Sequence, residues 1–331
     1  MSPWIWQSQV TDRSIVDQLQ ARLRLPAIVA PMFLISGPDI VIAAARAGIM
    51  GMFPAPNART IHDLSEWLAR ITRELTEAGR EGMWAINMIV HPTYDRFDAE
   101  LDLVCEYKPQ IVVTALGNPR RPMDRIHAYG GSVFADVISP AQARKAADAG
   151  ADGLILVASG AGGHTGHYSH FAFVEEVRSF WDGPLVLAGA IGSGNAIRAA
   201  LTLGADFAYM GTRFIATREA QVAEANREML VRSGMEDIVT TRAVTGIASN
   251  WMRESLEASG FTAEMLEEKK KVDFSNMGDT KAWKSIWGAG HSVGRTCRIQ
   301  TVAEVVDELA DEYAGGTSRA QSIERWSTCR R

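Results

Sequence analysis

The sequence has few cysteines, no long apolar run and no excess of positive charge. Its three cysteines, Cys105, Cys297 and Cys329, are far apart and show neither metal-ligand spacing nor the pattern of a disulfide framework, which fits a reducing compartment. No stretch approaches the roughly 18 apolar residues that a membrane-spanning helix needs. With a formal net charge of −5, the chain also lacks the basic surface typical of proteins that bind nucleic acids or anionic membranes.

The first twenty residues carry charge where a secretory signal peptide requires an unbroken apolar stretch. The charged residues are Asp12, Arg13 and Asp17. We therefore expect a cytoplasmic protein that acts on a small molecule, with no nucleic-acid or membrane partner. Whether the chain forms a homodimer is left open by the sequence.

From about residue 26 onward, short apolar runs alternate with amphipathic segments. The runs lack a clean period of two, as expected of strands that are buried on both faces. The expected strands cover residues 27–32, 50–55, 84–90, 111–116, 133–137, 153–158, 185–190 and 207–212. Eight strands with helices between them predict an α/β fold of the (β/α)8 TIM-barrel type. A doubly wound parallel sheet is the alternative.

Turn residues mark where two of the intervening helices begin or end. Ser139 is expected to cap a helix whose first residue is Pro140, and Gly150 follows the end of that helix. Gly204 ends a later helix in the same way.

The remaining sequence divides into an arm, an insertion and a tail around the barrel. Residues 1–25 are expected to form an N-terminal helical arm, and residues 316–331 a C-terminal tail. The barrel takes residues 26–217 together with about 286–315, which contain the run TVAEVVDELADEY as the eighth helix. Residues 218–285 are then a mostly helical insertion between strand 8 and helix 8. An insertion at this point is expected to cover the active-site face of the barrel.

Glycine-containing turns follow the last two expected strands. Gly189 and Ala190 follow the seventh strand, and Gly211 and Thr212 follow the eighth. Phosphate groups favour these two loops in (β/α)8 barrels, where backbone N–H groups and a helix N-terminus meet. Glycine lets the backbone approach an anion closely, and Thr212 adds a hydroxyl donor. Tight strand–helix turns without a ligand are the alternative interpretation.

Several short motifs at the expected strand ends are similar to those of one known family. They are APM at 30–32, AIN at 85–87, AGGHTG at 161–166, LAGAIG at 187–192 and GADFAYMGTRF at 204–214. As a set they resemble the nitronate monooxygenase, or 2-nitropropane dioxygenase-like, family of FMN-dependent (β/α)8 barrels. The resemblance spans residues 26–217, with a weaker match at 287–290. Related barrels include NADH:quinone reductases and flavin-dependent enoyl-thioester reductases.

The resemblance implies a role for particular positions. It places the backbone of Pro31 and Met32 beside the flavin ring, and it gives Asn87 a hydrogen bond to the cofactor. The other contacts that it implies are Gly162 and Gly163 against the FMN, Gly189, Ala190, Gly211 and Thr212 at its phosphate, and His164 as the catalytic histidine.

Three positions depart from the family pattern. Val157-Ala158 stands where the family often has a Gln, Ala190 replaces a glycine, and Tyr209 replaces a Gln at the start of the last motif. We therefore expect an intact cofactor site and an unusual substrate side.

Residues 159–170, SGAGGHTGHYSH, hold three histidines at intervals of three. Metal binding is one interpretation, but no carboxylate or cysteine lies nearby in sequence to complete a ligand set, and no metal site is expected. Phosphate binding is better served by the two later loops. Because His164 follows the sixth strand and imidazole titrates near neutral pH, we expect it to remove the α-proton of a nitroalkane. A histidine that only bonds a loop carbonyl is the alternative.

Other residues near this face have weaker support from the sequence. Ser169 is expected to cap the following helix, which makes His170 structural. The expected substrate-pocket residues are Asp136, His167, Trp287 and His291. Asp136 would orient His164 or a ligand, or it would simply cap the next helix, and Trp287 is alternatively a core residue.

The sequence favours an FMN-dependent oxidoreductase, with nitronate monooxygenase activity on alkyl nitronates or nitroalkanes and O2 as the leading function. An FMN-dependent NAD(P)H:quinone or enoyl-thioester reductase is the second hypothesis, since a nicotinamide can stack on a flavin without a domain of its own. A non-catalytic FMN-binding protein is the third.

Overall fold

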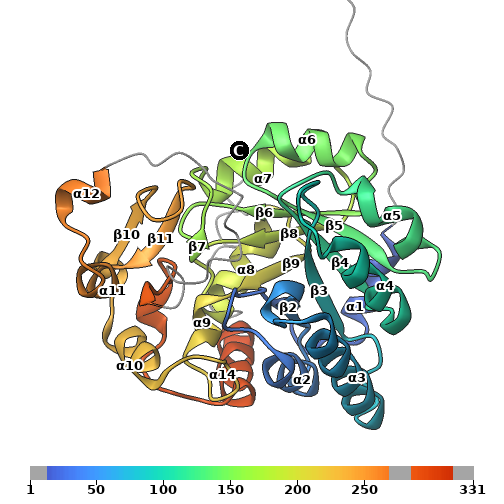
Figure 1. The fold of residues 1–331 in the computed structure, drawn as a ribbon, viewed down its shortest axis with the longest axis horizontal. Coiled ribbons are helices and arrows are strands. Elements are labelled where there is room, and N and C mark those ends of the chain that lie inside the picture. Colours follow the sequence, from blue (N-terminus) through green and yellow to red (C-terminus); the bar gives the residue numbers. More distant parts are fainter. Residues whose placement is uncertain (1–12, 268–284, 316–331) are drawn as a thin grey trace, which may run out of the picture.

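The computed structural model describes residues 13–267 and 285–315. Eight parallel strands form one sheet in the order β1-β9-β8-β6-β5-β4-β3-β2, with helices around its outside (Figure 1). These strands are β1 (Ala27–Val29), β2 (Gly51–Pro54), β3 (Trp84–Ile89), β4 (Ile111–Ala115), β5 (Ser132–Val137), β6 (Gly153–Val157), β8 (Leu185–Ala188) and β9 (Phe207–Met210). The predicted (β/α)8 barrel is confirmed.

The barrel closes between its first two strands. Ile28 pairs with Met50 in a parallel bridge just before β2. The Val29 N–H donates to the Met50 carbonyl at 2.9 Å, and the Met50 N–H donates to the Ala27 carbonyl at 3.3 Å. Helices cover the outside and side chains fill the inside, so every residue of a strand such as β3 is buried. This explains why the strand sequences are apolar without alternation.

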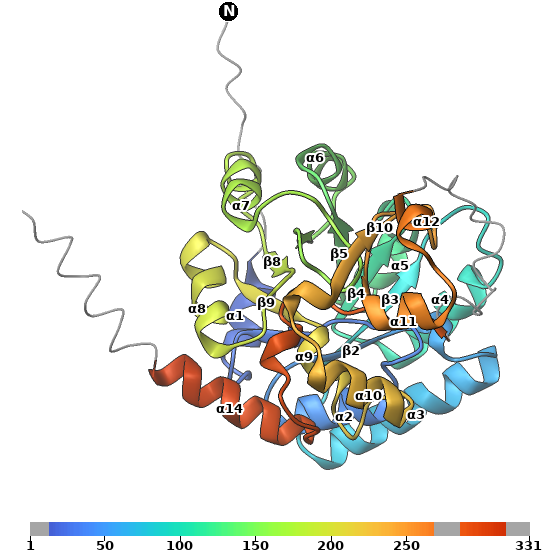
Figure 2. The same ribbon diagram turned by 90° about the vertical axis from the view of Figure 1, so that its left-hand side faces the viewer.

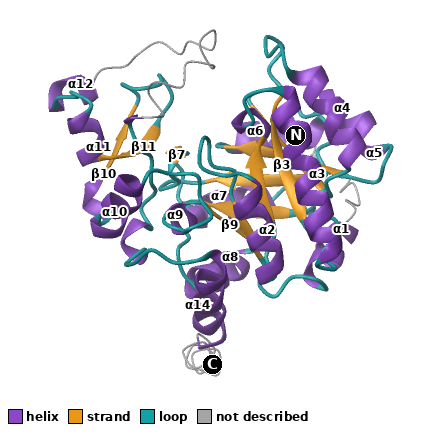
Figure 3. Cartoon of the chain, turned by 60° about the horizontal axis from the view of Figure 1, so that its bottom comes forward, coloured by secondary structure: helices purple, strands orange, loops and turns teal. Residues whose placement is uncertain are grey.

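A ring of helices surrounds the strands, as Figure 3 shows. They are α2 (Pro38–Ala47), α3 (Ile61–Glu77), α4 (Phe97–Tyr107), α5 (Arg120–His127), α6 (Pro140–Asp148), α7 (His170–Arg178), α8 (Gly194–Leu203) and α14 (Val302–Gly315). Ser139 and Ser169 cap α6 and α7 as predicted, each accepting a hydrogen bond from a backbone N–H of the first helical turn. Because α14 packs between α2 and α8, it is the eighth helix of the ring.

The helix α1 (Ser14–Gln20) precedes the barrel and lies at the N-terminal ends of its strands. Val16 and Leu19 are buried. Arg13 pairs with Asp206, just before β9, and the Gln110 side chain, just before β4, donates to Gln18 at 3.3 Å. These contacts place α1 at the end of the barrel opposite the loops that follow the strands. The first twelve residues of the predicted arm and the predicted C-terminal tail lie outside the described residues.

The segment between β9 and α14 leaves the barrel and returns. Its described elements are the helices α9 (Thr212–Ile215), α10 (Glu224–Arg232), α11 (Arg253–Ala258) and α12 (Ala263–Glu267), the short 3-10 helices η2 (Met235–Asp237) and η3 (Val293–Arg295), and the strands β10 (Ile238–Thr241) and β11 (Ser249–Met252). In Figure 1 these elements lie at one side of the barrel, and Figure 2, viewed from that side, shows β10 and α11 in front of the strands. Residues 268–284 of the predicted insertion lie outside the described residues.

The expectation of a mostly helical insertion missed a small antiparallel sheet. β11 pairs with β10 on one side and with β7 (Gly163–His164) on the other. β10 and β11 have only four residues each, and their polar Thr and Ser positions give no strong strand pattern. Across the parts of the chain that the structure describes, no helix has the length and apolar character needed to span a membrane.

Candidate functional site

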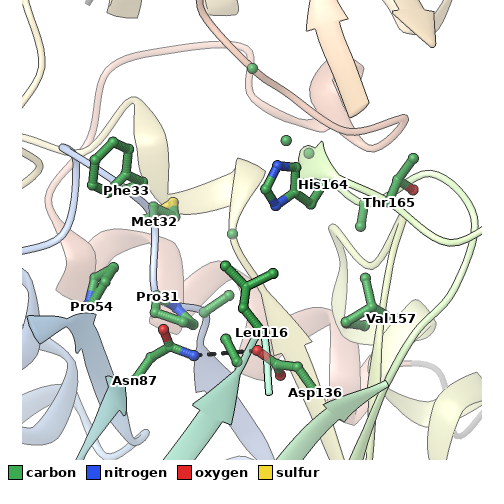
Figure 4. Close-up of a pocket in the computed structure, with 18 of the residues that line it drawn as sticks. Pro31, Met32, Phe33, Pro54, Asn87, Leu116, Asp136, Val157, His164 and Thr165 are labelled. Carbon is green, nitrogen blue, oxygen red and sulfur yellow. Dashed lines mark hydrogen bonds between the residues drawn. The ribbon is translucent and has the colours of Figure 1, made fainter. Parts of the chain in front are cut away.

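A large cavity opens at the C-terminal ends of the barrel strands. Its volume is about 2080 Å³, and loops from around the barrel line it together with residues of the insertion (Figure 4). Drug-sized ligand sites are typically about 300–1,000 Å³. The cavity therefore has room for a cofactor and a second ligand at the same time.

The cavity brings together most of the residues that the sequence selected. The predicted residues that line it are Pro31, Met32, Asn87, Asp136, Gly162, Gly163, His164, Gly189, Ala190, Gly211, Thr212 and Trp287. They come from seven different segments of the chain: Asn87 and Asp136 belong to β3 and β5, and most of the others belong to loops.

Two predicted pocket residues, His167 and His291, are not among the described residues that line the cavity. The ring of His167 packs against Tyr168, with ring centroids 4.1 Å apart. The ring of His291 lies behind Gly160: a Cβ at Gly160 would come within 2.9 Å of the His291 Nδ1. The sequence does not show how the loop after His164 or the segment after Trp287 packs, so it could not separate these two histidines from those that line the cavity.

A pair of polar side chains forms the floor of the cavity. Asn87 Nδ2 donates to Asp136 Oδ2 across 3.3 Å, from the end of β3 to the end of β5 (Figure 4). The other carboxyl oxygen, Oδ1, is buried and has no hydrogen-bond partner among the described residues. Burial raises the pKa of Asp136 to about 7. In the structure the Asn87 amide nitrogen donates to Asp136, and the expected hydrogen bond from Asn87 to the cofactor stays a prediction.

The imidazole of His164 faces the cavity from above this floor (Figure 4). Its backbone belongs to β7, where His164 is opposite Ser249 and Gly163 is opposite Asn250. The following N–H, of Thr165, donates to the Ala248 carbonyl at 3.0 Å. The surrounding protein lowers the pKa of His164, because desolvation disfavours the charged ring. Desolvation therefore favours the neutral form of the ring, which is the form that accepts a proton.

The glycines before His164 permit close packing within the chain itself. A Cβ on Gly162 would lie 2.9 Å from the Gly290 nitrogen, and Gly290 in turn approaches the Gly160 carbonyl. The Asn250 side chain also donates to the Ala161 carbonyl at 2.7 Å. These glycines were expected to leave room for a flavin ring. The structure shows that Gly162 must be small because the returning 287–291 segment passes directly beside it.

The two loops that were expected to hold a phosphate lie side by side in the cavity wall. Ala190 N–H donates to the Gly160 carbonyl at 3.2 Å, and Thr212 Oγ1 accepts from the Gly290 N–H at 2.8 Å. The nearby N-terminus of α8 is already occupied, since the Gly194 N–H donates to the carboxylate of Glu312 at 2.8 Å. An anion at these loops would therefore depend on the loop amides and the Thr212 hydroxyl more than on the α8 dipole.

Backbone strain is concentrated around the cavity. Among the described non-glycine residues, four have positive φ, and three of these, Leu34 (φ 61°), Leu116 (φ 59°) and Ala190 (φ 50°), line the cavity. Such conformations cost roughly 1–3 kcal/mol each and gather at functional sites. Leu116 was not predicted as a site residue. Leucine rarely adopts a positive φ, so nothing in the sequence indicates this conformation at Leu116.

The three histidines of the SGAGGHTGHYSH motif have separate surroundings. His164 faces the cavity, His167 packs on Tyr168, and His170 Nε2 lies 2.7 Å from the Gly189 carbonyl oxygen. Within the described ranges, no group of three or more His, Cys, Asp or Glu side chains is placed to hold a metal ion.

The sequence that forms the cavity and its loops matches the model of a known family over almost the whole barrel. The family model for nitronate monooxygenase matches residues 20–312. The chain belongs to the nitronate monooxygenase family. Members of this family are flavin-dependent oxidoreductases, and the chain is an oxidoreductase of this type. Its site fits a flavin: the cavity is large, its wall carries the two glycine loops, and its floor presents a buried carboxyl oxygen that has no partner in the described parts of the chain.

The names of two relatives refer to different substrates. The chain is 28% identical over 241 residues to a (3aS,4S,5R,7aS)-5-hydroxy-7a-methyl-1-oxo-octahydro-1H-indene-4-carboxyl-CoA dehydrogenase of Rhodococcus jostii, a match that covers 71% of this chain and 65% of that protein. It is also 28% identical to a nitronate monooxygenase of Neurospora crassa, over 90% of this chain and 92% of that protein.

Solved structures share the fold of this nitronate monooxygenase family member. A nitroalkane oxidase from Streptomyces ansochromogenes superposes with a TM-score of 0.78 at 24% identity, covering 91% of this chain and 99% of that one. At this level of identity the likeness shows the fold alone.

Proposed function

We propose that the protein is an FMN-dependent nitronate monooxygenase that oxidises alkyl nitronates or nitroalkanes with O2, with His164 as the catalytic base. The observation that carries the proposal is the position of His164: its ring faces the cavity above the polar floor, and its pKa is lowered. A nitroalkane must lose an α-proton before it becomes a nitronate, and a neutral imidazole is the side chain suited to remove it.

The phosphate of FMN is assigned to the two glycine loops. Gly189 and Ala190 on one side, and Gly211 and Thr212 on the other, line the same cavity. Thr212 Oγ1 accepts one hydrogen bond from Gly290 and still has its own hydrogen to donate to a phosphate oxygen. The ring system would then extend over Pro31, Met32 and the Asn87–Asp136 floor.

The reaction uses this chain for binding, orientation and proton transfer. His164 takes the α-proton onto its unprotonated nitrogen, and β11 keeps the ring in place by pairing with the backbone of His164. A bound flavin would supply the electron-transfer chemistry between the substrate anion and O2. The apolar residues Val244 and Ile247 of the insertion and Ile286, just after it, line the cavity and help to exclude water from the substrate.

Oxidation of a thioester of coenzyme A type is a second candidate function. The cavity volume of about 2080 Å³ exceeds what FMN and a small nitroalkane need, and the exposed basic side chains of Arg59 and Lys145 line it. Cations at this position suit an anionic carrier. The relative from Rhodococcus jostii, whose name includes a carboxyl-CoA group, points in the same direction.

Anaerobic stopped-flow absorbance separates these functions. The purified protein is mixed in turn with an alkyl nitronate, NADH, NADPH and a carboxyl-CoA thioester, and flavin bleaching is followed. We expect bleaching by the nitronate within seconds. Bleaching by the thioester alone would favour the second function, and bleaching by NADH or NADPH alone would favour a reductase. A bound flavin that no donor reduces would contradict any of these enzymes and favour a binding protein.

The identity of the cofactor is tested separately. Flavin released by heat should run as FMN on chromatography, and recovery of FAD would contradict the proposal.

A further inference from the structure

The first residue of α7 contacts one of the two glycine loops from behind. His170 Nε2 lies 2.7 Å from the carbonyl oxygen of Gly189. A carbonyl oxygen only accepts, so Nε2 carries the hydrogen and donates it. Ser169 caps α7 and fixes the position of His170 at the start of that helix. His170 is not among the described residues that line the cavity, so any effect on a ligand passes through the loop.

The peptide group between Gly189 and Ala190 is held at both ends. Its carbonyl oxygen accepts from His170, and its N–H, which belongs to Ala190, donates to the Gly160 carbonyl at 3.2 Å. The backbone on either side has positive φ, 108° at Gly189 and 50° at Ala190. Two hydrogen bonds therefore fix a peptide in a conformation that the chain does not readily adopt by itself.

Neighbouring atoms leave the loop at Gly189 little room for another backbone conformation. A Cβ at Gly189 would lie 2.7 Å from the Ser159 carbonyl oxygen and 3.1 Å from His170 Nε2. The backbone just after β6 and the ring of His170 thus enclose Gly189 on the side away from the cavity. The shape of the loop in the cavity wall therefore depends on these contacts.

We propose that His170 is a positioning residue for the anion-binding loop, and that it sets residues 189 and 190 in the shape that receives the phosphate of FMN. This inference depends on the proposed FMN site. Its importance follows from the occupied N-terminus of α8, where Glu312 already takes the Gly194 N–H. Because that helix end is occupied, the geometry of the loop matters more for the binding of a phosphate.

The test compares two flavins that differ only in the phosphate. Full-length apoprotein is titrated with FMN and with riboflavin, and binding is followed by flavin fluorescence. His170→Leu removes the donor, and we expect FMN affinity to fall about tenfold, the scale of one hydrogen bond. Riboflavin affinity should stay within about twofold, because riboflavin has no phosphate for the loop to bind.

Two further variants guard against an effect of folding alone. Gln at position 170 has an amide nitrogen that can replace Nε2, so His170→Gln should keep most of the FMN affinity. His167→Leu changes a neighbouring histidine that packs on Tyr168, and it should bind both flavins as the wild type does.

The outcomes distinguish the positioning role of His170 from the proposed FMN-dependent function. Equal losses for FMN and riboflavin, or no loss in His170→Leu, would overturn the positioning role while wild-type FMN binding stands. A wild type that binds neither flavin would overturn the proposed function and the positioning role together.

Discussion

His164 is opposite Ser249 in the antiparallel pairing of β7 with β11. The residue that we propose as the base thus follows a barrel strand, but its backbone is held by a strand of the insertion. Asn250 strengthens this link, because its side chain donates to the Ala161 carbonyl at 2.7 Å and accepts from the Thr240 hydroxyl. The insertion therefore holds the loop that carries His164 and also lines the cavity.

Replacement of Asn250 should loosen the loop that carries His164. Asn250 is buried, so Asn250→Ala leaves the Ala161 carbonyl and the Thr240 hydroxyl without this partner. We expect the free energy of unfolding to fall by about 1–3 kcal/mol, the cost of unsatisfied buried polar groups. Urea denaturation measures the loss, and hydrogen exchange should rise in residues 159–166. Asn195→Ala, at an exposed position of α8, is the control and should change neither.

The sequence predicted the barrel well because buried parallel strands have a strong pattern. The run predicted at 84–90, for example, is β3, Trp84–Ile89, and the cap predicted at Ser139 begins α6. The loops after strands carried the site predictions, and the fold brings these loops together at one end. All nine predicted cofactor residues therefore line the cavity.

Contacts between distant segments were beyond the reach of the sequence. β7 is only Gly163–His164 and becomes a strand because β11, more than eighty residues later, pairs with it. Likewise, nothing in the sequence relates His170 to Gly189, or Gly162 to Gly290, since each contact depends on how separate loops pack. The prediction that His291 lines the pocket failed for the same reason.

The left-handed backbone conformation of Ala190 is expected to lower the free energy of unfolding. Its φ of 50° is left-handed, a region that costs an L-residue roughly 1–2 kcal/mol and glycine almost nothing. Ala190→Gly should raise the free energy of unfolding by about 0.5–1 kcal/mol, after the greater freedom of glycine in the unfolded chain is subtracted. Ala196→Gly, inside α8, should lower it by about 1 kcal/mol. A loss of stability in both variants would contradict the strain at Ala190.

Asp136 should make folding stability depend on pH. Its pKa is about 7 in the folded protein against 3.8 for an ordinary Asp, so between these values the folded state holds a proton that the unfolded state has lost. Stability from this group is therefore greatest at low pH and falls as pH rises toward 7. Asp136→Asn removes this dependence, because an amide does not ionise.

The matched measurement is urea denaturation of apoprotein at pH 4 and pH 8. We expect Asp136→Asn to be more stable than the wild type at pH 8, by on the order of 2 kcal/mol relative to the difference at pH 4. Asp148→Asn, at an exposed position of α6, should show little change between the two pH values. An Asp136→Asn variant that follows the wild type at both pH values would show that this carboxyl ionises freely in the cavity.

The role of His164 is tested by giving the protein its substrate with and without the α-proton. A positioned general base contributes about 10²–10⁴-fold in rate. His164→Ala should therefore lose activity on the neutral nitroalkane by a factor in this range while it keeps its flavin. The same variant should retain much more activity on the pre-formed nitronate, which has already lost its proton. Turnover by oxygen consumption, with flavin content checked by absorbance, measures both.

The pH dependence of the wild type gives an independent check of the same step. Only the neutral ring accepts a proton, and the pKa of His164 is below its usual 6.5. The wild-type rate on the neutral nitroalkane should rise with pH below about 6.5 and level off above it. The residual rate of His164→Ala on the same substrate should lack this rise. Equal losses of His164→Ala on both substrates, with full flavin content, would assign His164 to substrate orientation, because a base is needed only for the substrate that still has its proton.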